Sequence, residues 1–543
     1  MQQSGREYLK GLQSTLAEAG LQGALQAGGF KVLLRYVADV QGDLDVVHAI
    51  LEQLKTSMDE QGTVSQASVE AAIQQIAGGG SSNMPQHVTV IDAFQVPRVR
   101  YDAIHKRLVE DNSRPATLQA PPEEKVRLAQ ARFNLLYQRL RRNALFAPTN
   151  PALPSGQPHA QLTELTGLKG AIGQRCIVMG VISSSEEGAT CIEDEGAVVP
   201  LDLSNAKTTG GLITENCVVV AQGEMGADGV FVVQELGFPG CERRSELPAT
   251  AKKLNFFGAP LLSAEQQARM ELAELDAQDD RIVFLANVWL DRPDTFEALH
   301  TLLSGFQDAG TIPSMLVFMG NFSAAATPGS ADADYVGLRE GFTRLARLID
   351  TYAAIKEGSR CVFVPGPHDP GLGAILPQPR LPSYFTSELQ AVLPNAVFAT
   401  NPCRIKYFSK EVVVFRYDLM KHMRRRCLLT LPDDIADSPD ALFEQLALTV
   451  LQQSTLCPLP LAVQPVHWAH DHALQLYPLP HALVLADASP QASLSHEGCT
   501  VFNPGCLQER NFAAYMPIQD EVEPSCLPGS GPDGREDTGE EDD

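Results

Sequence analysis

The sequence predicts a multidomain α+β protein that combines a helical N-terminal domain, a small β-barrel and a larger α/β domain. Three observations predict this class. Apolar residues recur at helical spacing in residues 1–77, five short strand-like runs follow one another in residues 161–245, and apolar runs alternate with amphipathic stretches in residues 255–518. The length of 543 residues fits about three or four domains of ordinary size.

The first segment, residues 1–77, carries apolar stripes of the kind that form one face of a helix, such as Leu9, Leu12 and Leu16. A glycine-rich run at 78–83 follows and is typical of a flexible linker. We therefore expect a helical docking domain on a tether.

Residues 78–160 are expected to be a linker and a connecting helix. Six lysines and arginines lie within residues 125–142. Charged runs on helices are usually solvated, so we expect this helix to expose its basic face.

The segment 161–245 is expected to form an OB-fold barrel. Turn residues separate most of its five runs of alternating apolar residues, and we expect a helical insert between the third and fourth strands. The expected strands cover 175–183, 188–194, 197–203, 216–223 and 229–236. Single-strand binding needs aromatic platforms in a basic groove. Phe231 is the only aromatic residue in 161–237, where eleven acids outnumber three basic residues, so we expect a protein-binding or packing module.

The composition limits the function further. The formal net charge is −24, which argues against independent DNA binding without excluding a local basic patch. Residues 519–543 are expected to be an acidic disordered tail, because ten acids in 520–543 face only Arg535. There is no apolar run of about 18 residues, no apolar signal core near Met1 and no C-x-x-C pair among eleven cysteines. These features predict an intracellular protein with free thiols and no membrane contact.

The α/β segment 255–518 places unusual residues where its apolar strands end. An active site in such a domain would lie in these loops. The loop residues of interest are Asn287, Trp289, Asn321, Pro367, His368, Asp487 and Ser489. The order and placement of these loops resemble those of calcineurin-like metallophosphoesterases, which hold two metals with carboxylates and imidazoles.

The resemblance implies that this metal site is degenerate. Asn287 stands in place of the first aspartate, Trp289 in place of its histidine and Asn321 in place of the bridging aspartate. Pro367 replaces a ligand asparagine, the last motif lacks both histidines, and only His368 matches, while Asp487 could still coordinate a metal weakly. Tryptophan has no lone pair to offer a metal, and a neutral amide is a poor bridging ligand. We therefore expect no catalytic residue, no metal and no cofactor.

Longer strings are similar to the B-subunit family of DNA polymerase epsilon. They are LNFFGAP at 254–260, NVWLD at 287–291, FVPGPHDPG at 363–371, TNPCRIKYFSKEVVVFRYDL at 400–419, CPLPLAVQPVHWAHDHALQLYPLP at 457–480 and FNPGC at 502–506. The resemblance implies a nuclear, non-catalytic accessory subunit in chromosomal DNA replication. It would scaffold the C-terminal region of the catalytic subunit and dock on the replicative helicase assembly through 1–77. It would meet small histone-fold subunits indirectly and DNA only within the complex.

Alternatives from other classes stay open. One is an active metal-dependent phosphodiesterase or nuclease, and another is a stand-alone single-stranded-DNA-binding protein. The corresponding accessory subunit of polymerase delta is a neighbour of similar architecture. The histidines His467, His470, His472 and His481 could in principle hold zinc, although ordinary packed or surface histidines are the more common case.

Overall fold

The computed structural model describes residues 88–143, 145–146, 160–259, 264–324, 334–371 and 374–529, with the single positions Leu33, Leu54 and Val69. The chain divides into two units, residues 1–86 and 87–543. Apart from those three buried, helical positions, the expected N-terminal helical domain lies outside the described residues. Among the helices that are described, none combines the length and hydropathy needed to cross a membrane.

The larger unit contains two six-stranded sheets that form the α/β domain. The first sheet has the order β13-β12-β11-β10-β19-β20, in which β10 to β13 run parallel, β19 pairs antiparallel with β10, and β20 pairs antiparallel with β19. Its strands are β10 (Ile282–Leu285), β11 (Met315–Met319), β12 (Arg360–Val364), β13 (Val397–Phe398), β19 (Asn511–Met516) and β20 (Glu521–Cys526). Its helices are α7 (Pro293–Ala309), α8 (Tyr335–Asp350), α9 (Ala353–Gly358) and α10 (Ser383–Val392), and α6 (Ala264–Asp276) precedes β10.

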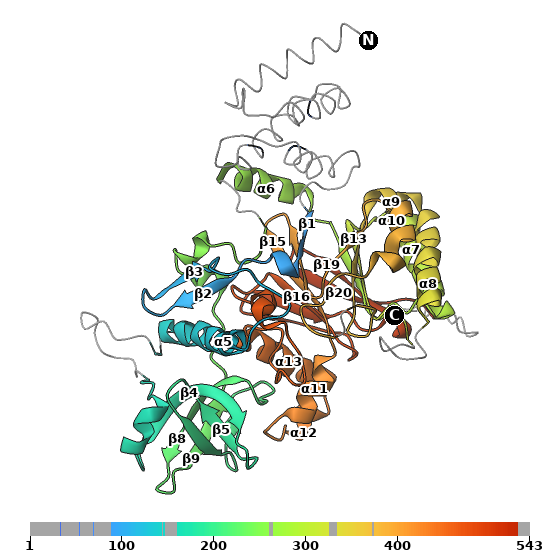
Figure 1. Cartoon of the computed structure of the whole chain (residues 1–543). Helices are drawn as coiled ribbons and strands as arrows, with labels where there is room; N and C mark the ends of the chain where they lie inside the picture. Colours follow the sequence, from blue (N-terminus) through green and yellow to red (C-terminus); the bar gives the residue numbers. More distant parts are fainter. Residues whose placement is uncertain are drawn as a thin grey trace, which may run out of the picture. The chain divides into compact units, whose positions relative to one another are not determined.

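The second sheet has the order β1-β14-β15-β16-β18-β17. Its strands are β1 (Val88–Asp92), β14 (Cys403–Tyr407), β15 (Lys410–Arg416), β16 (Ala482–Ala486), β17 (Ala492–His496) and β18 (Cys499–Asn503). Its helices are α11 (Leu419–Arg426), α12 (Asp433–Ala436) and α13 (Pro439–Gln453), and the short 3-10 helix η5 covers Trp468–Leu474. Figure 1 shows α7 to α10 grouped on one side of the strands and α11 to α13 on another.

The two sheets pack face to face, which explains why their central strands are apolar throughout. Phe284 of β10 and Val414 of β15 share one core between the sheets. Leu285 faces the other way, against α7 and α8, and Phe415 packs with α11 and α13. The order of layers is therefore helices, sheet, sheet, helices. Strands that are covered on both faces cannot alternate apolar and polar residues.

The barrel is confirmed as an OB-type arrangement of short, mainly antiparallel strands. Its order is β6-β5-β4-β8-β9-β7, and a β6–β9 pairing closes it. The strands are β4 (Arg175–Ser184), β5 (Thr190–Glu193), β6 (Val198–Asp202), β7 (Lys207–Thr208), β8 (Val218–Met225) and β9 (Phe231–Gly237). All five expected strands are present.

The helical insert expected between the third and fourth strands is wrong. That segment contains β7 and then turns through two glycines with left-handed backbone, Gly210 (φ 131°) and Gly211 (φ 86°). A Cβ on Gly211 would lie 2.3 Å from the Phe238 ring. The backbone N–H groups of Gly211 and Leu212 donate to side chains of α13 instead of to a helical turn.

The interpretation of residues 78–160 as only linker and connecting helix also needs correction. β1 pairs antiparallel with β14 and so belongs to the second sheet. A hairpin of β2 (Val99–Asp102) and β3 (Arg107–Glu110) precedes α5 (Glu123–Arg142). The basic face of α5 is not simply solvated, because Arg132 is 9% exposed and Arg139 is 4% exposed.

The acidic tail begins later than expected. β20 pairs with β19 along its whole length, and Val522 packs against the core between the sheets. An apolar residue on the inner face and a free edge on β19 are sufficient to order this acidic segment. The disordered tail predicted for 519–543 is therefore wrong over 519–529, and the remainder lies outside the described residues.

Candidate functional site

The structure brings several of the strand-end loops together around one buried side chain, Arg416. This arginine is the last residue of β15 and is 1% exposed. Its Nε donates to the Gly320 carbonyl (2.8 Å) after β11, and its Nη2 donates to Asn287 Oδ1 (2.7 Å) after β10. Its Nη1 donates to the Ala486 carbonyl (3.2 Å) at the end of β16. The guanidinium therefore joins strand ends from both sheets.

One carboxylate faces this buried charge directly. Asp418 Oδ1 accepts from Arg416 Nη1 at 2.7 Å and from the backbone N–H of Ala488 at 3.0 Å. Burial acts to raise the pKa of Asp418, but the adjacent guanidinium outweighs burial and the pKa is lowered. A buried arginine is stable only where its donors are satisfied, and these contacts satisfy them.

Asn287 is shaped to hold the arginine. It has left-handed backbone with φ 56°, a conformation that asparagine adopts more readily than most residues. Its Oδ1 accepts from Arg416, and its Nδ2 lies 3.3 Å from Cys506 Sγ. Both ends of the side-chain amide are therefore occupied inside the protein.

Asp369 is an important residue that the sequence reasoning missed. It is 2% exposed, and its carboxylate accepts from the backbone N–H groups of Phe322 (2.7 Å) and Gly366 (2.7 Å). Burial raises the pKa of Asp369 to about 6, although these hydrogen bonds and Arg416 oppose the shift. A Cβ on Gly320 would lie 1.9 Å from Asp369 Oδ2. Asp369 therefore fixes the loops after β11 and β12. Its position directly after His368, at the end of a predicted strand, is the feature by which the sequence could have identified it.

Asp487 is also engaged inside the chain. Its Oδ2 accepts from the Met420 N–H (2.9 Å) in the first turn of α11, and its Oδ1 accepts from the Ser489 N–H (3.0 Å). Burial raises the pKa of Asp487 to about 6. A carboxylate at this end of a helix satisfies backbone donors that lack helical partners. Asp487 therefore caps α11 rather than facing an open site.

The remaining predicted positions lie around this cluster. Asn321 Oδ1 accepts from the backbone N–H of His368 at 3.0 Å, and the His368 side chain is exposed. Ser489 accepts from Asn503 through its carbonyl (2.9 Å) and its hydroxyl (3.1 Å). Pro367 is buried. Trp289 is half-buried, and its buried Nε1 has no hydrogen-bond partner among the described residues.

Within the described ranges, no group of three or more His, Cys, Asp or Glu side chains is placed to hold a metal ion. Three of the four histidines considered above, His470, His472 and His481, pack as neutral groups. Burial lowers the pKa of His470 to about 4, of His472 to about 3 and of His481 to about 4. His472 Nε2 lies 3.0 Å from the Val96 carbonyl, and His470 meets the Phe94 ring edge-on.

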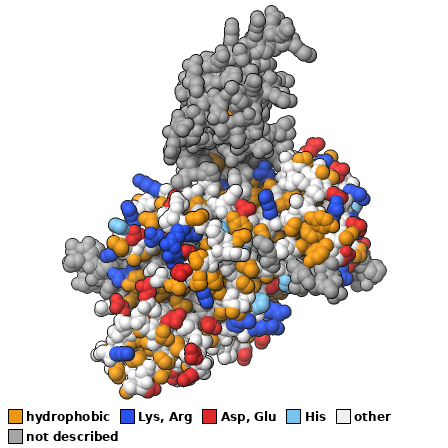
Figure 2. Space-filling view, in the orientation of Figure 1, with side chains coloured by type: hydrophobic (Ala, Val, Ile, Leu, Met, Phe, Trp, Pro, Cys, Tyr) orange, Lys and Arg blue, Asp and Glu red, His pale blue; other side chains and the backbone are white. Residues whose placement is uncertain are grey.

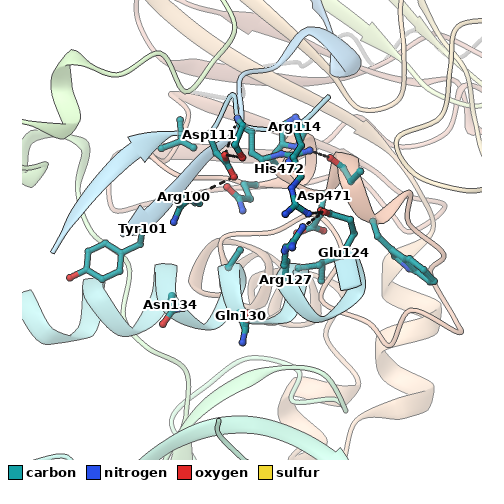
Figure 3. A pocket seen from close by; sticks show the side chains of 18 residues that line it. Arg100, Tyr101, Asp111, Arg114, Glu124, Arg127, Gln130, Asn134, Asp471 and His472 are labelled. Carbon is teal, nitrogen blue, oxygen red and sulfur yellow. Dashed lines mark hydrogen bonds and ion pairs between the residues drawn. The ribbon is translucent and has the colours of Figure 1, made fainter. Parts of the chain in front are cut away.

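A second feature is a cleft of about 370 Å³ between the β2–β3 hairpin, α5 and η5. Figure 3 shows charged side chains of both signs pointing into it. Arg100 lies 3.4 Å from Asp111, and Arg127 and Arg114 lie 2.5 Å and 3.8 Å from Glu124. Each of these arginines faces a carboxylate, but Arg114 and Arg127 share Glu124, so the cleft holds a network of ion pairs with a small excess of positive charge.

The floor of this cleft is a buried ion pair. Arg132 of α5 donates from Nε (3.1 Å) and Nη2 (2.5 Å) to the two oxygens of Asp471, and its Nη1 donates to the Cys457 carbonyl. Further along the helix, Arg139 donates to the Ser454 hydroxyl and to the Pro239 carbonyl after β9. Helix α5 therefore connects the α/β domain with the end of the barrel.

Two other contacts attach the barrel to the α/β domain. The Gln453 side chain at the end of α13 accepts from the Val218 N–H (2.8 Å) and donates to the Val218 carbonyl (2.8 Å), as a neighbouring strand would. On α5, Leu136 and Leu140 pack against Met179 and Val218 of the barrel. The barrel and the α/β domain therefore share a packed, hydrogen-bonded junction.

Comparison with known proteins gives consistent matches over most of the chain. Residues 282–493 match the family model for the B subunit of DNA polymerase alpha/epsilon, and residues 122–240 match DNA polymerase epsilon subunit 2-like, OB-fold domain. The chain is 39% identical to the B subunit of DNA polymerase epsilon from Arabidopsis thaliana, over 89% of this chain and 92% of the relative. It is 35% identical to DNA polymerase epsilon subunit 2 of Bos taurus (89% and 92%) and of Homo sapiens (88% and 92%).

Proposed function

The chain belongs to the family of DNA polymerase epsilon B subunits, and we propose that it is the non-catalytic accessory subunit of that polymerase in chromosomal replication. Membership of the family implies a complex with the catalytic subunit, and the polymerase chemistry belongs to that partner. The nucleus is the compartment in which such a complex works.

We further propose that the α/β domain is a calcineurin-like phosphoesterase fold that has lost its metal centre. The order of helices, sheet, sheet and helices supports this, as does the position of the degenerate loops at the strand ends. The observation that carries the proposal is Arg416. Its guanidinium lies between Asn287, Gly320 and Ala486, which follow or end three central strands.

A permanent cation at this point acts against metal binding. Two unit charges 4 Å apart interact by about 4 kcal/mol at an effective dielectric constant of about 20. A divalent ion beside Arg416 would meet roughly twice that repulsion, while the carboxylates Asp369, Asp418 and Asp487 are already used in hydrogen bonds. The guanidinium supplies the positive charge that such strand-end loops otherwise receive from metals, and it supplies no bound water.

The expected result is therefore no metal-dependent hydrolysis of bis-nitrophenyl phosphate with manganese, zinc or iron. Combining Asn287→Asp, Trp289→His and Asn321→Asp should not create activity, because Arg416 remains at the centre and would pair with the new carboxylate at 287. Adding Arg416→Gln to this triple variant is the sharper control, because it also removes the cation that acts against metal binding. Hydrolysis by the wild-type chain above a mock-purified sample would contradict the non-enzymatic assignment.

The barrel, α5 and the α/β domain are proposed to form the scaffold that holds the C-terminal region of the catalytic subunit. The hydrogen-bonded junction at Gln453 and the packing of α5 support a shared, preorganised surface. Residues 1–77 are proposed to dock on the replicative helicase assembly, and the small histone-fold subunits are proposed to be indirect partners. DNA is met within the complex.

Co-expression with the C-terminal region of an epsilon catalytic subunit, followed by size-exclusion chromatography, tests this proposal. We expect co-elution of the full chain and of a chain that begins at residue 86. An obligate interface of this kind should bury more than about 2,000 Å² and survive dilution. Failure of the full chain to co-elute would contradict the scaffold proposal, and failure of only the shortened chain would contradict the separate roles of the two units.

A further inference from the structure

Helix α11 presents an unusual cluster of positive charge. Lys421, Arg424, Arg425 and Arg426 are all exposed, and we call these four side chains the α11 basic surface. None of them forms an ion pair or a side-chain hydrogen bond with any residue in the described part of the chain. The space-filling view in Figure 2 shows a group of Lys and Arg side chains over the region where Figure 1 places α11.

The two acids near the start of this helix, Asp418 and Asp487, already accept hydrogen bonds from other groups of the chain. Asp418 is bonded to Arg416 and to the Ala488 N–H, and Asp487 caps the first turn through the Met420 N–H. The same positive charge acts on the imidazole of His422. Burial lowers the pKa of His422, and Arg426 and Lys421 lower it further, with only Asp418 opposing them. Neither of these two acids is therefore free to pair with the four side chains of the α11 basic surface.

The other face of α11 is held firmly in the fold. Leu419, Met420 and Met423 are buried in the core that also contains α13. Just after the helix, the Leu428 N–H donates to the Ile213 carbonyl of the barrel at 2.9 Å. A nuclear-import receptor that reads an extended basic peptide could not take this segment without removing three core side chains from the fold. A rigid, helical display of cations fits a partner that is itself a regular polyanion.

We propose that the α11 basic surface contacts the phosphate backbone of duplex DNA. Only the identification of the polyanion as DNA rests on the proposed function, whereas the charge and geometry belong to α11 itself. Because the whole chain carries a net charge of −24, this contact is local and weak alone and would act when the polymerase complex holds DNA nearby. The contact would be independent of base sequence, since backbone contacts position a protein without reading bases.

The test is a salt titration of the full chain with a short labelled DNA duplex, followed by fluorescence anisotropy. Four phosphate contacts predict a slope of log K against log salt of about −3.6, which is a loss of roughly 100-fold in affinity between about 50 and 200 mM salt. The variant Arg424→Glu/Arg425→Glu/Arg426→Glu should bind at least about tenfold more weakly at the lower salt, with a slope reduced by about 3. The milder Lys421→Gln should reduce the slope by about 1.

The matched control is Arg141→Glu/Lys169→Glu/Lys253→Glu, which changes the net charge equally at three exposed, scattered positions. It should keep the wild-type slope. Equal behaviour of the two triple variants, or no binding by the wild-type chain at low salt, would overturn the proposal. The proposal would also be overturned if the α11 triple variant lost binding to an import receptor but kept the wild-type affinity for DNA. Co-elution of each variant with the catalytic subunit is measured in parallel, so failure of the scaffold function is seen separately.

Discussion

Helices α5 and α11 are both rich in arginine, yet the protein uses them in opposite ways. In α5, Arg132 and Arg139 are buried and bonded to Asp471, Ser454 and backbone carbonyls. In α11 the arginines are exposed and have no partner in the described chain. An arginine on a helix therefore acts as an internal support where the opposing surface offers oxygens, and as a contact group where it meets solvent. Four predictions test this contrast, from the largest expected effect to the smallest.

The ion pair of α5 should carry the largest share of stability. Arg132→Ala would leave the carboxylate of Asp471 buried without its partner, and breaking a buried pair in this way typically costs about 3–5 kcal/mol. We expect a clearly lowered midpoint in guanidinium unfolding. Arg141→Ala on the same helix is the control, because Arg141 is exposed and should change the free energy of unfolding by less than about 0.5 kcal/mol. Similar losses from both substitutions would remove the distinction between buried and exposed arginines.

The junction beside α5 should be the next most sensitive element. Gln453→Ala removes both hydrogen bonds to the buried backbone of Val218 and should cost about 2–3 kcal/mol. Limited proteolysis should then cut between the barrel and the α/β domain, whereas the wild-type chain should be cut first near 78–85, 147–160 and after 529. Gln445→Ala is a milder comparison, because it removes one bond to Gly211. Rapid cutting of the wild-type chain near 238–254 would contradict a rigid junction.

Acidification should lower the free energy of unfolding, because the histidines that are buried beside α5 are neutral in the folded protein. The pKa of His472 is lowered by burial to about 3, below the unfolded value of about 6.5. Its stabilising contribution is complete above pH 6.5 and is lost as pH falls toward 3, because the unfolded state takes up the proton first. Between pH 6.5 and 5, one such group costs about 2 kcal/mol.

The variant His472→Gln tests this assignment. The glutamine amide can still donate toward the Val96 carbonyl, but it does not titrate, so stability should fall less steeply between pH 6.5 and 5. The carboxyls Asp369 and Asp487 act in the opposite sense over this range, because their raised pKa values favour the folded state as pH falls through 6. An unchanged pH profile in His472→Gln would show that another group controls the loss.

The exposed arginines of α11 should matter least for folding. Arg424→Ala, Arg425→Ala and Arg426→Ala together should shift the free energy of unfolding by under about 1 kcal/mol, since exposed substitutions are usually small and only the favourable interaction with the helix C-terminus is lost. Thermal unfolding followed by circular dichroism measures this. A loss comparable to that of Arg132→Ala would mean that α11 also supports the fold.

Much of this organisation is visible in the sequence, because it depends on local patterns. Alternation and turn residues predict five of the six strands of the barrel, and apolar runs such as 282–285 predict strands that are covered on both faces. The unusual residues at 287, 321 and 367 are evident as soon as the strand ends are located. Local chemistry also explains the failures: Gly210 and Gly211 prevent the expected insert helix, and pairing with β19 orders acidic residues that have no helical or strand signal of their own.

The centre of the candidate site was decided only by the tertiary structure. Arg416 lies 129 residues from Asn287 in the chain, and although it stands inside the family-like string 400–419, nothing in that string indicates that its side chain is buried against Asn287. The same holds for Arg132 and Asp471, which are separated by 339 residues. The sequence by itself determined most of the elements and the family, and it predicted a degenerate metal site. Which charges are buried with a partner and which face solvent depends on long-range packing, because an arginine has the same local pattern in both cases and only the surface opposite decides its use.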